Sequence, residues 1–144
     1  MLLLADVRPG ELVCDLGAGD GRILSTAVHD FGAKGFGVEI HPARYAEILQ
    51  RFSKEHIQNS VTIVHGDFSD VDLREADVVT LYLLTSVNST IRPKLERELK
   101  PGSRVVSHDF PIRGWNPIHV ETVKDRHTTH EIYVYKIPTS IART

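Results

Sequence analysis

Cysteine, tryptophan and methionine each occur once in this chain of 144 residues. A single cysteine cannot build a disulfide framework, and Cys14 lies in an apolar run where a buried thiol is expected. No apolar run approaches the ~20 residues that a membrane helix requires. The apolar residues 1–4 are followed at once by Asp6 and Arg8, which is unlike a signal peptide. We therefore expect a cytoplasmic protein with no membrane association.

A large net charge of one sign is also missing. The net charge is −2, but residues 1–77 hold 7 Lys and Arg against 13 Asp and Glu, whereas residues 78–144 hold 10 against 6. The basic side chains at 92, 94 and 97 alternate with Glu96 and Glu98, a mixture typical of a solvated helix face. Charge therefore does not favour a nucleic-acid partner, although the second half could contact an acidic protein or RNA.

Linkers, repeats and low-complexity tracts are absent as well, so we expect one domain spanning residues 1–144. Short apolar runs alternate with amphipathic stretches, the pattern of βαβ units. The predicted strands are 12–16, 35–40, 61–65, 76–83 and 104–109, and the predicted helices are 21–31, 42–56 and 88–99. Pro42 suits a first helical turn, whereas Pro93 is expected to divide the third helix.

The pattern changes after Phe110, where two further strands are predicted at 120–124 and 131–137 with a connection at 125–130. The complete prediction is a doubly wound α/β fold. It has a mostly parallel seven-stranded sheet, helices on both faces and a C-terminal antiparallel hairpin. The hairpin separates this Rossmann-like fold from a plain dinucleotide-binding fold.

A glycine-rich turn follows the first predicted strand, in the segment Asp15-Leu-Gly-Ala-Gly-Asp-Gly. Its G-x-G-x-G spacing differs from the G-x-G-x-x-G that seats a pyrophosphate at a helix N-terminus. Asp15 and Asp20 would repel a pyrophosphate but suit a ligand that carries an ammonium and a sulfonium group. S-adenosylmethionine (SAM) presents both groups. A tight structural turn without a ligand is the alternative.

Two more carboxylates are predicted at the same sheet edge. Glu39 ends the second strand, where it could accept hydrogen bonds from both ribose hydroxyls, or simply favour the next helix dipole. Asp67 follows the third strand and could accept from the adenine amine, with Phe68 bordering the ring. Because ligands of open α/β sheets bind along this edge, the three carboxylates together indicate an adenosine ligand.

The chain resembles the archaeal seven-strand protein-lysine methyltransferases, which are related to mitochondrial lysine methyltransferases of eukaryotes. The motifs around Asp15, Glu39 and Asp67 are generic for class I methyltransferases. The segments 80–88, Ser107-His-Asp-Phe110 and Arg113-Gly-Trp115 carry the specific likeness. The resemblance implies methyl transfer from SAM to lysine ε-amines of protein substrates. That family usually has an N-terminal segment covering the cofactor, which this chain is expected to lack.

The expected cofactor-binding residues are Asp15, Gly17, Gly19, Asp20, Glu39, Ile40, Asp67, Phe68 and Leu83. Tyr82 and Asp109 are the candidate catalytic residues: Tyr82 would face the lysine ammonium and Asp109 would orient the amine. A core role for Tyr82 and a structural role for Asp109 remain open. Trp115 is expected to pack on the sheet rather than line the entrance. No general base is predicted, because an apolar channel beside the sulfonium would itself lower the lysine pKa.

No metal site is expected, since His119, His127 and His130 do not have the spacing of a standard zinc site. His108 has no predicted role. A methyltransferase acting on RNA or a small-molecule amine, and a SAM-binding module without catalysis, are the alternative functions. The oligomeric state is not predicted.

Overall fold

The computed structural model describes residues 1–82 and 85–141. Its centre is a seven-stranded sheet in the order β3-β2-β1-β4-β5-β7-β6. The strands are β1 (Leu12–Leu16), β2 (Lys34–Glu39), β3 (Val61–His65), β4 (Val78–Leu81), β5 (Arg104–His108), β6 (His119–Lys124) and β7 (Thr129–Lys136). Strands β1 to β5 are parallel, whereas β7 pairs antiparallel with both β5 and β6. The predicted fold class, including the terminal hairpin, is confirmed.

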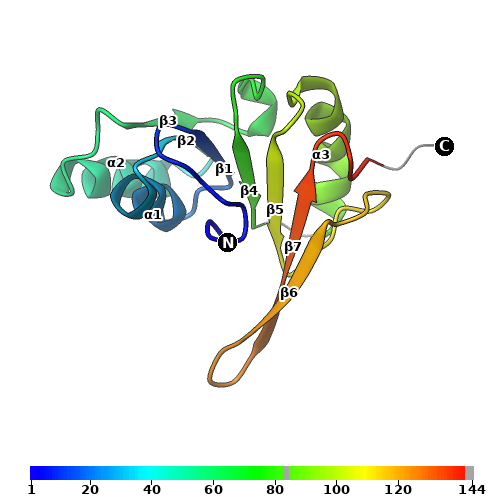
Figure 1. The fold of residues 1–144 in the computed structure, drawn as a ribbon. Helices are drawn as coiled ribbons and strands as arrows, with labels where there is room; N and C mark the ends of the chain where they lie inside the picture. The colour runs from blue at the N-terminus through cyan, green and yellow to red at the C-terminus, as the bar shows by residue number, and fades with distance from the viewer. Residues whose placement is uncertain (83–84, 142–144) are drawn as a thin grey trace.

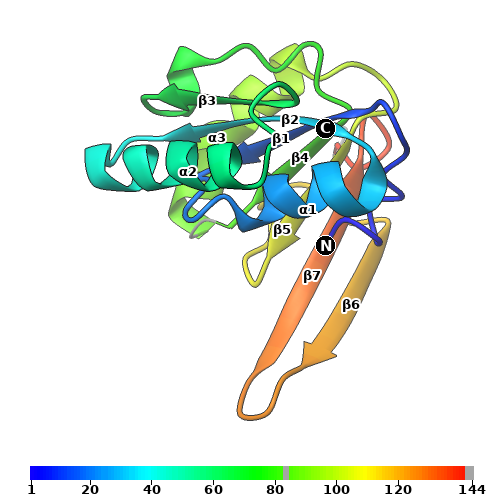
Figure 2. The ribbon, with the colours of Figure 1, turned by 90° about the vertical axis from the view of Figure 1, so that its left-hand side faces the viewer.

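Helices cover both faces of this sheet, as Figures 1 and 2 show. Helices α1 (Arg22–Phe31) and α2 (Pro42–Lys54) lie on one face, and α3 (Thr85–Glu98) lies on the other. The buried side chains form two matching clusters. Leu24, Ile48 and Phe52 pack on one face, and Ile91 and Leu95 pack on the other. Within the described residues, no helix has the length and apolar character needed to cross a membrane.

Helix α3 corrects one prediction. Pro93 lies inside an uninterrupted helix and does not divide it into two pieces. Pro93 is exposed, so water can satisfy the carbonyl that lacks its usual N–H partner. Ile91 and Leu95 are fully buried on either side of it, and their packing holds the helix together. Tertiary packing has therefore overridden the local preference of proline.

The segment before β1 is tied to β5 through Arg104. The Arg104 guanidinium donates to the carbonyls of Ala5 and Asp6 at 2.9 and 3.1 Å, and to the Glu11 carboxylate at 2.6 and 3.0 Å. Both charged side chains are largely buried, at 17% and 20% exposure. This hydrogen bonding lowers the pKa of Glu11 below its ordinary value. Residues far apart in sequence are thereby joined beside the sheet.

The β6–β7 hairpin projects beyond the rest of the sheet (Figures 1 and 2). His108, the last residue of β5, pairs with Ile132, but the pairing of β6 with β7 continues as far as Lys124 and Thr129. The start of β7 therefore extends past the carboxyl end of β5. Any site at this edge has the hairpin as a side wall.

Candidate functional site

Two neighbouring cavities lie at the carboxyl ends of the parallel strands, and Gly17 lines both of them. The smaller one, which we call the adenosine-side cavity, has a volume of about 130 Å³. Its lining residues include Glu39, Ile40, Asp67 and Phe68. The larger one, the methionine-side cavity, has a volume of about 290 Å³. Its lining residues are Asp15, Gly17, Ala18, Gly19, Asp20, Arg22, Ile23 and Tyr82.

The glycine-rich turn between the cavities needs its glycines. Gly17, Gly19 and Gly21 have φ values of 82°, 60° and 81°, in the left-handed region that side chains disfavour. A Cβ atom at Gly21 would also come within 3.2 Å of the Phe52 ring. The turn therefore brings bare backbone to the cavity floor, where a ligand can approach closely.

Asp15 is a buried carboxyl at the base of the methionine-side cavity, with 2% exposure. Burial raises the pKa of Asp15 to about 7, and the nearby charges of Asp20 and Glu39 add to this effect. A hydrogen bond from the Thr80 hydroxyl, at 2.8 Å, opposes it. A cationic ligand would supply the positive charge that the buried Asp15 carboxylate lacks.

Glu39 is held in place by the backbone. One carboxylate oxygen accepts from the Gly19 N–H at 3.2 Å and the other accepts from the His41 N–H at 3.0 Å. The side chain is 6% exposed and borders the adenosine-side cavity. Each oxygen keeps a further lone pair, so both could accept from a pair of vicinal hydroxyls. The geometry suits the predicted role of Glu39 at a ribose.

The other expected cofactor residues lie along the same edge with more exposed side chains. Asp20 is 57% exposed and forms an ion pair with Arg22 at 3.2 Å, so its charge is already partly engaged. Asp67 is exposed and accepts from the Ser69 N–H at 2.8 Å, which caps the short helix η1 (Phe68–Asp70). Ile40 is 66% exposed, Phe68 is half-buried, and both border the adenosine-side cavity. Leu83 lies outside the described residues.

Tyr82 follows β4 and is 59% exposed, so the alternative of a core aromatic residue is wrong. Its ring stacks on His108 with centroids 4.2 Å apart and planes at 14°. Asp109 accepts from the Glu131 N–H at 3.1 Å and pairs with His130 at 2.9 Å. The two expected catalytic side chains are thus joined through histidines.

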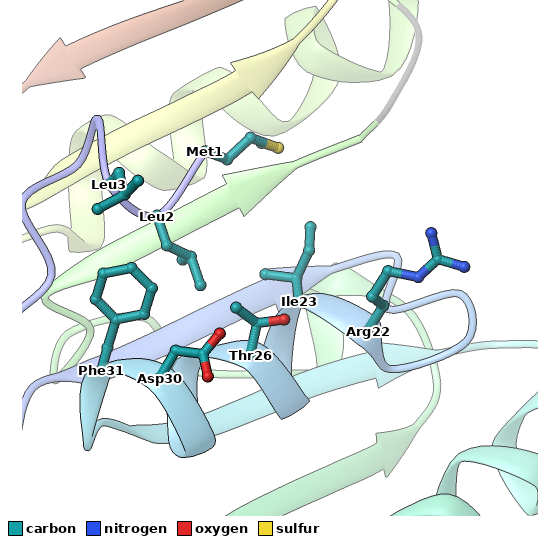
Figure 3. Close-up of a pocket in the computed structure, with 8 residues that line it drawn as sticks. All are labelled: Met1, Leu2, Leu3, Arg22, Ile23, Thr26, Asp30 and Phe31. Carbon is teal, nitrogen blue, oxygen red and sulfur yellow. The ribbon is translucent and has the colours of Figure 1, made fainter. Parts of the chain in front are cut away.

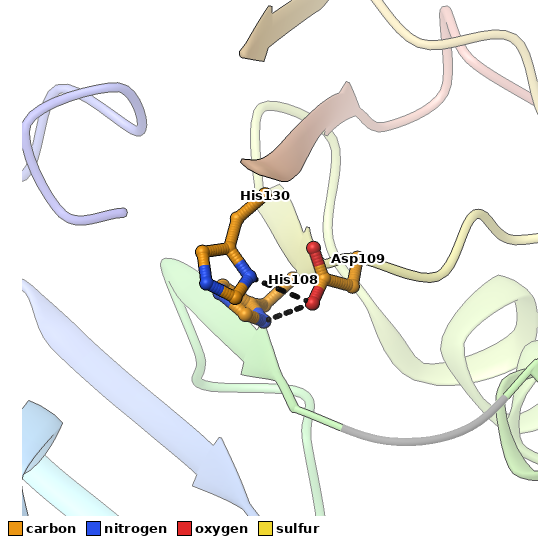
Figure 4. Close-up of side chains that lie close together, drawn as sticks. All are labelled: His108, Asp109 and His130. Atoms are coloured by element: carbon orange, nitrogen blue, oxygen red, sulfur yellow. Dashed lines mark hydrogen bonds and ion pairs between the residues drawn. The ribbon is translucent and has the colours of Figure 1, made fainter. Parts of the chain in front are cut away.

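Sequence reasoning missed His108 and His130. His108 carried a signal, because it directly precedes Asp109 at the end of a predicted strand. His130 carried none, because its place depends on how the hairpin pairs with β5. Figure 4 shows both imidazoles beside the Asp109 carboxylate. One ligand atom from each of the three side chains lies within 4.8 Å of the others, a spacing that a metal ion could also use.

A third cavity, of about 550 Å³, lies between the N-terminal segment and α1 (Figure 3). It shares Arg22 and Ile23 with the methionine-side cavity, so the two are neighbours. Its lining is mainly apolar, with Met1, Leu2 and Leu3 facing Ile23 and Phe31 of α1. This cavity was not predicted from the sequence.

Trp115 is packed as expected. It is 6% exposed, its ring lies edge-on to Tyr135 at 5.5 Å, and its indole N–H donates to Glu96 at 2.7 Å. Since both the ring and the N–H have partners in the protein, the packing interpretation of Trp115 is confirmed.

Comparison with known proteins decides the family. The model of the ANTKMT methyltransferase domain matches residues 15–119. A protein-lysine N-methyltransferase of Saccharolobus islandicus (strain REY15A) is 51% identical over 138 residues, which cover 95% of this chain and 86% of that protein. The chain belongs to the ANTKMT methyltransferase family. The mouse adenine nucleotide translocase lysine N-methyltransferase is 36% identical over 83% of the chain, which spans 52% of the mouse protein.

Solved structures agree with this assignment. A crystal structure of an RNA methyltransferase from Salinibacter ruber in complex with S-adenosyl-L-homocysteine has a TM-score of 0.89 and 40% identity to this methyltransferase. The match covers 99% of this chain and 91% of that one. The methyltransferase uses SAM as its methyl donor.

The residues of the site fit SAM. Burial disfavours the ionised Asp15 carboxyl, which a positively charged ligand would stabilise. The glycine turn leaves room for a ligand, and Glu39 offers two oriented oxygens. Glu39 would hold the ribose, Asp67 and Phe68 would border the adenine, and Asp15 with the glycine turn would receive the methionine part. SAM supplies a methyl group on a sulfonium. The protein must align an acceptor with that group.

Proposed function

We propose that this methyltransferase transfers methyl groups to lysine ε-amines of proteins. The observation that carries the proposal is the 51% identity to a protein-lysine N-methyltransferase over 95% of the chain. The more distant mouse relative is also named as a lysine N-methyltransferase. Both matches include the strand β4 to β5 region, where Tyr82 lines the methionine-side cavity and His108 stacks on Tyr82.

We call the region around Tyr82, beside the methionine-side cavity, the acceptor end of the site. Its side chains suit an alkylammonium group. The exposed Tyr82 ring can contact a lysine cation through its face. The third cavity, between the N-terminal segment and α1, is apolar and can take the aliphatic part of the lysine side chain. A lysine must lose a proton before it can attack. From a pKa near 10.4 to pH ~7.4, that deprotonation costs about 4 kcal/mol.

RNA is the second candidate substrate, because the structure from Salinibacter ruber is described as an RNA methyltransferase and is 40% identical. The net charge of −2 gives no general attraction to phosphates, although residues 78–144 carry an excess of basic side chains. We favour protein because the relative with higher identity is named for lysine methylation.

The test is to incubate the purified protein with radiolabelled SAM and a lysate of its own organism. Parallel samples are then digested with protease or with ribonuclease. Label removed by protease and spared by ribonuclease supports the proposal, and mass spectrometry then identifies the modified residues. Label lost to ribonuclease, or found on arginine or histidine rather than lysine, would reject it. Glu39→Ala serves as the control, because it lacks the expected ribose contact.

We also propose that the protein acts in the cytoplasm. The support is compositional: one cysteine, Cys14, which is buried in β1 and has a pKa raised well above its usual value by that burial. An unreactive single thiol suits a reducing compartment. Fractionation of cells followed by immunoblotting tests this proposal, and recovery in the membrane fraction would contradict it.

A further inference from the structure

Three aromatic rings form a column at the acceptor end of the sheet. Tyr82 follows β4, His108 ends β5 and His130 lies at the start of β7. The centroids of Tyr82 and His108 are 4.2 Å apart, and those of His108 and His130 are 4.8 Å apart at 36°. His108 is therefore the middle ring, and its side chain is 13% exposed.

The column begins at the methionine-side cavity. Leu81 of β4 pairs with Ser107 of β5, so Tyr82 and His108 are the next residues along two neighbouring parallel strands. Tyr82 lines the cavity together with Asp15 and the glycine turn. An acceptor amine aligned with the methyl group at this edge would thus meet Tyr82 and His108.

His130 is fixed on both of its ring nitrogens. Nδ1 lies 2.9 Å from Asp109 Oδ2 and Nε2 lies 2.9 Å from the Thr128 hydroxyl oxygen. An ionised carboxylate only accepts, so Nδ1 carries the proton that it donates to Asp109. Asp109 in turn sits at φ 65°, in a turn held by the amide of the fully buried Asn88, which donates to the Phe110 carbonyl at 3.1 Å.

His108 differs from His130 because its ring is not tied down in this way. Its Nδ1 is 3.5 Å from Asp109 Oδ2, which is an ion-pair distance rather than a good hydrogen bond. Across residues 1–82 and 85–141, the structure shows no hydrogen bond to the His108 ring. With Nδ1 facing the Asp109 carboxylate, Nε2 is the nitrogen available to a proton donor that enters the site.

The groups that face His108 come from four parts of the chain. Burial lowers the pKa of His108 below its ordinary value. The Asp109 carboxylate opposes that shift, and the charges of His130 and of the amino group at Met1 reinforce it. Tyr82 contributes a stacked phenol on the remaining side. The lowered pKa favours the neutral ring, which is the form that can accept a proton.

We propose that His108 accepts the proton that a lysine ammonium must lose before methylation. The inference rests on the proposed function and assigns a proton acceptor to it. One N–H bond of the ammonium breaks and its electron pair stays on the lysine nitrogen. One N–H bond forms on the imidazole. The resulting imidazolium faces the Asp109 carboxylate, and the proton passes to water at the exposed edge of the ring.

The first experiment measures the single-turnover methylation rate of a purified acceptor protein from pH ~6.5 to ~9.5. With His108 as acceptor, the wild-type rate is flat over most of this range, because the proton stays on His108 during methyl transfer and passes to water only afterwards. His108→Phe keeps an aromatic ring under Tyr82 but removes the base. Its rate should fall about 10²-fold near pH 7 and then rise nearly tenfold per pH unit. His127→Phe, in the exposed hairpin turn, is the matched control and should behave as wild type.

Two further measurements separate chemistry from packing. Imidazole added to His108→Ala should raise its methylation rate at least tenfold. It should not raise the rate of His108→Phe, because the phenyl ring fills the space that imidazole would occupy. Nuclear magnetic resonance of the histidine rings should show the pKa of His108 below the ordinary histidine value. Calorimetry should show unchanged SAM affinity in the His108 variants.

Parallel pH profiles for wild type and His108→Phe, or no rescue by imidazole, would overturn the assignment while leaving lysine methylation intact. Loss of wild-type activity on EDTA treatment and its return with Zn²⁺ would also overturn it, because His108, Asp109 and His130 would then bind a metal. Wild type that methylates no lysine would instead reject the proposed function itself.

Discussion

Replacing Asp15 with asparagine should make the protein more stable, by an amount that grows with pH. Burial raises the pKa of Asp15 to about 7 from its ordinary value of 3.8. The folded state therefore holds a proton that the unfolded chain has already released between these two values. Folding takes up a proton in this range, so Asp15 makes the wild type less stable as the pH rises from about 4 to about 7. Asparagine has nothing to titrate.

The size of the effect follows from the same values. The shift of 3.2 units (7 − 3.8) corresponds to about 4 kcal/mol once Asp15 is fully ionised in the folded protein. About 2 kcal/mol of this cost is already present at pH ~5. The stability advantage of Asp15→Asn over wild type should therefore be about 2–3 kcal/mol larger at pH ~8 than at pH ~5. Asparagine keeps an acceptor for the Thr80 hydroxyl, so the packing is conserved.

Urea unfolding of both proteins at the two pH values measures this difference. Titrating groups that do not interact with Asp15 contribute equally to wild type and variant, so the double difference isolates Asp15 together with its coupling to Asp20 and Glu39. A pH-independent difference would refute the raised pKa. The same variant should bind SAM more weakly, because the carboxylate that favours a cation is gone. Tighter binding would refute the placement of Asp15 at the positively charged part of SAM.

Three further predictions concern other parts of the chain. Glu39→Ala should weaken SAM binding by about 2–4 kcal/mol in calorimetry, and unchanged affinity would remove Glu39 from the ribose. Arg104→Ala should lower the free energy of unfolding in urea by about 2–4 kcal/mol, since the Glu11 carboxylate loses its partner in a largely buried place. A loss below about 0.5 kcal/mol would mean that the pair behaves as a surface ion pair. Pro93→Ala should raise that free energy by about 1–3 kcal/mol, and a decrease would show that the proline itself stabilises α3.

The sequence predicted the parallel half of the fold well because its signals are local. Apolar runs bounded by glycine turns define β1 and β2, and their carboxyl ends carry Asp15 and Glu39. Strand and helix ends differ from prediction by a few residues, as for β4, expected at 76–83 and found at Val78–Leu81. The placement of Asp15 and Glu39 beside the cavities agrees with expectation, although their contacts with SAM stay predictions.

The acceptor end was less predictable because distant segments build it. Asp109 was expected either to orient the substrate amine or to have a structural role, and its contacts with the Glu131 N–H and with His130 were not predicted. His130 reaches that position through the pairing of β7 with β5, and a slip of one residue would turn it to the opposite face. No local pattern encodes that register. The prediction that Pro93 divides α3 was wrong because buried neighbours, which the local sequence does not reveal, hold the helix together.

The projecting β6–β7 hairpin can move independently of the part of the site that binds the cofactor. Residues 129–131 extend beyond β5 and have β6 as their strand partner, and all six residues of β6 are exposed. Segments with few buried contacts open locally at low free-energy cost, on timescales much shorter than global unfolding. The glycine turn, by contrast, is anchored against Phe52 and the core. The hairpin, which forms the side wall of the site, can therefore open and admit an acceptor side chain while the cofactor remains bound. On the proposed function, such an opening would admit lysines from differently shaped protein surfaces.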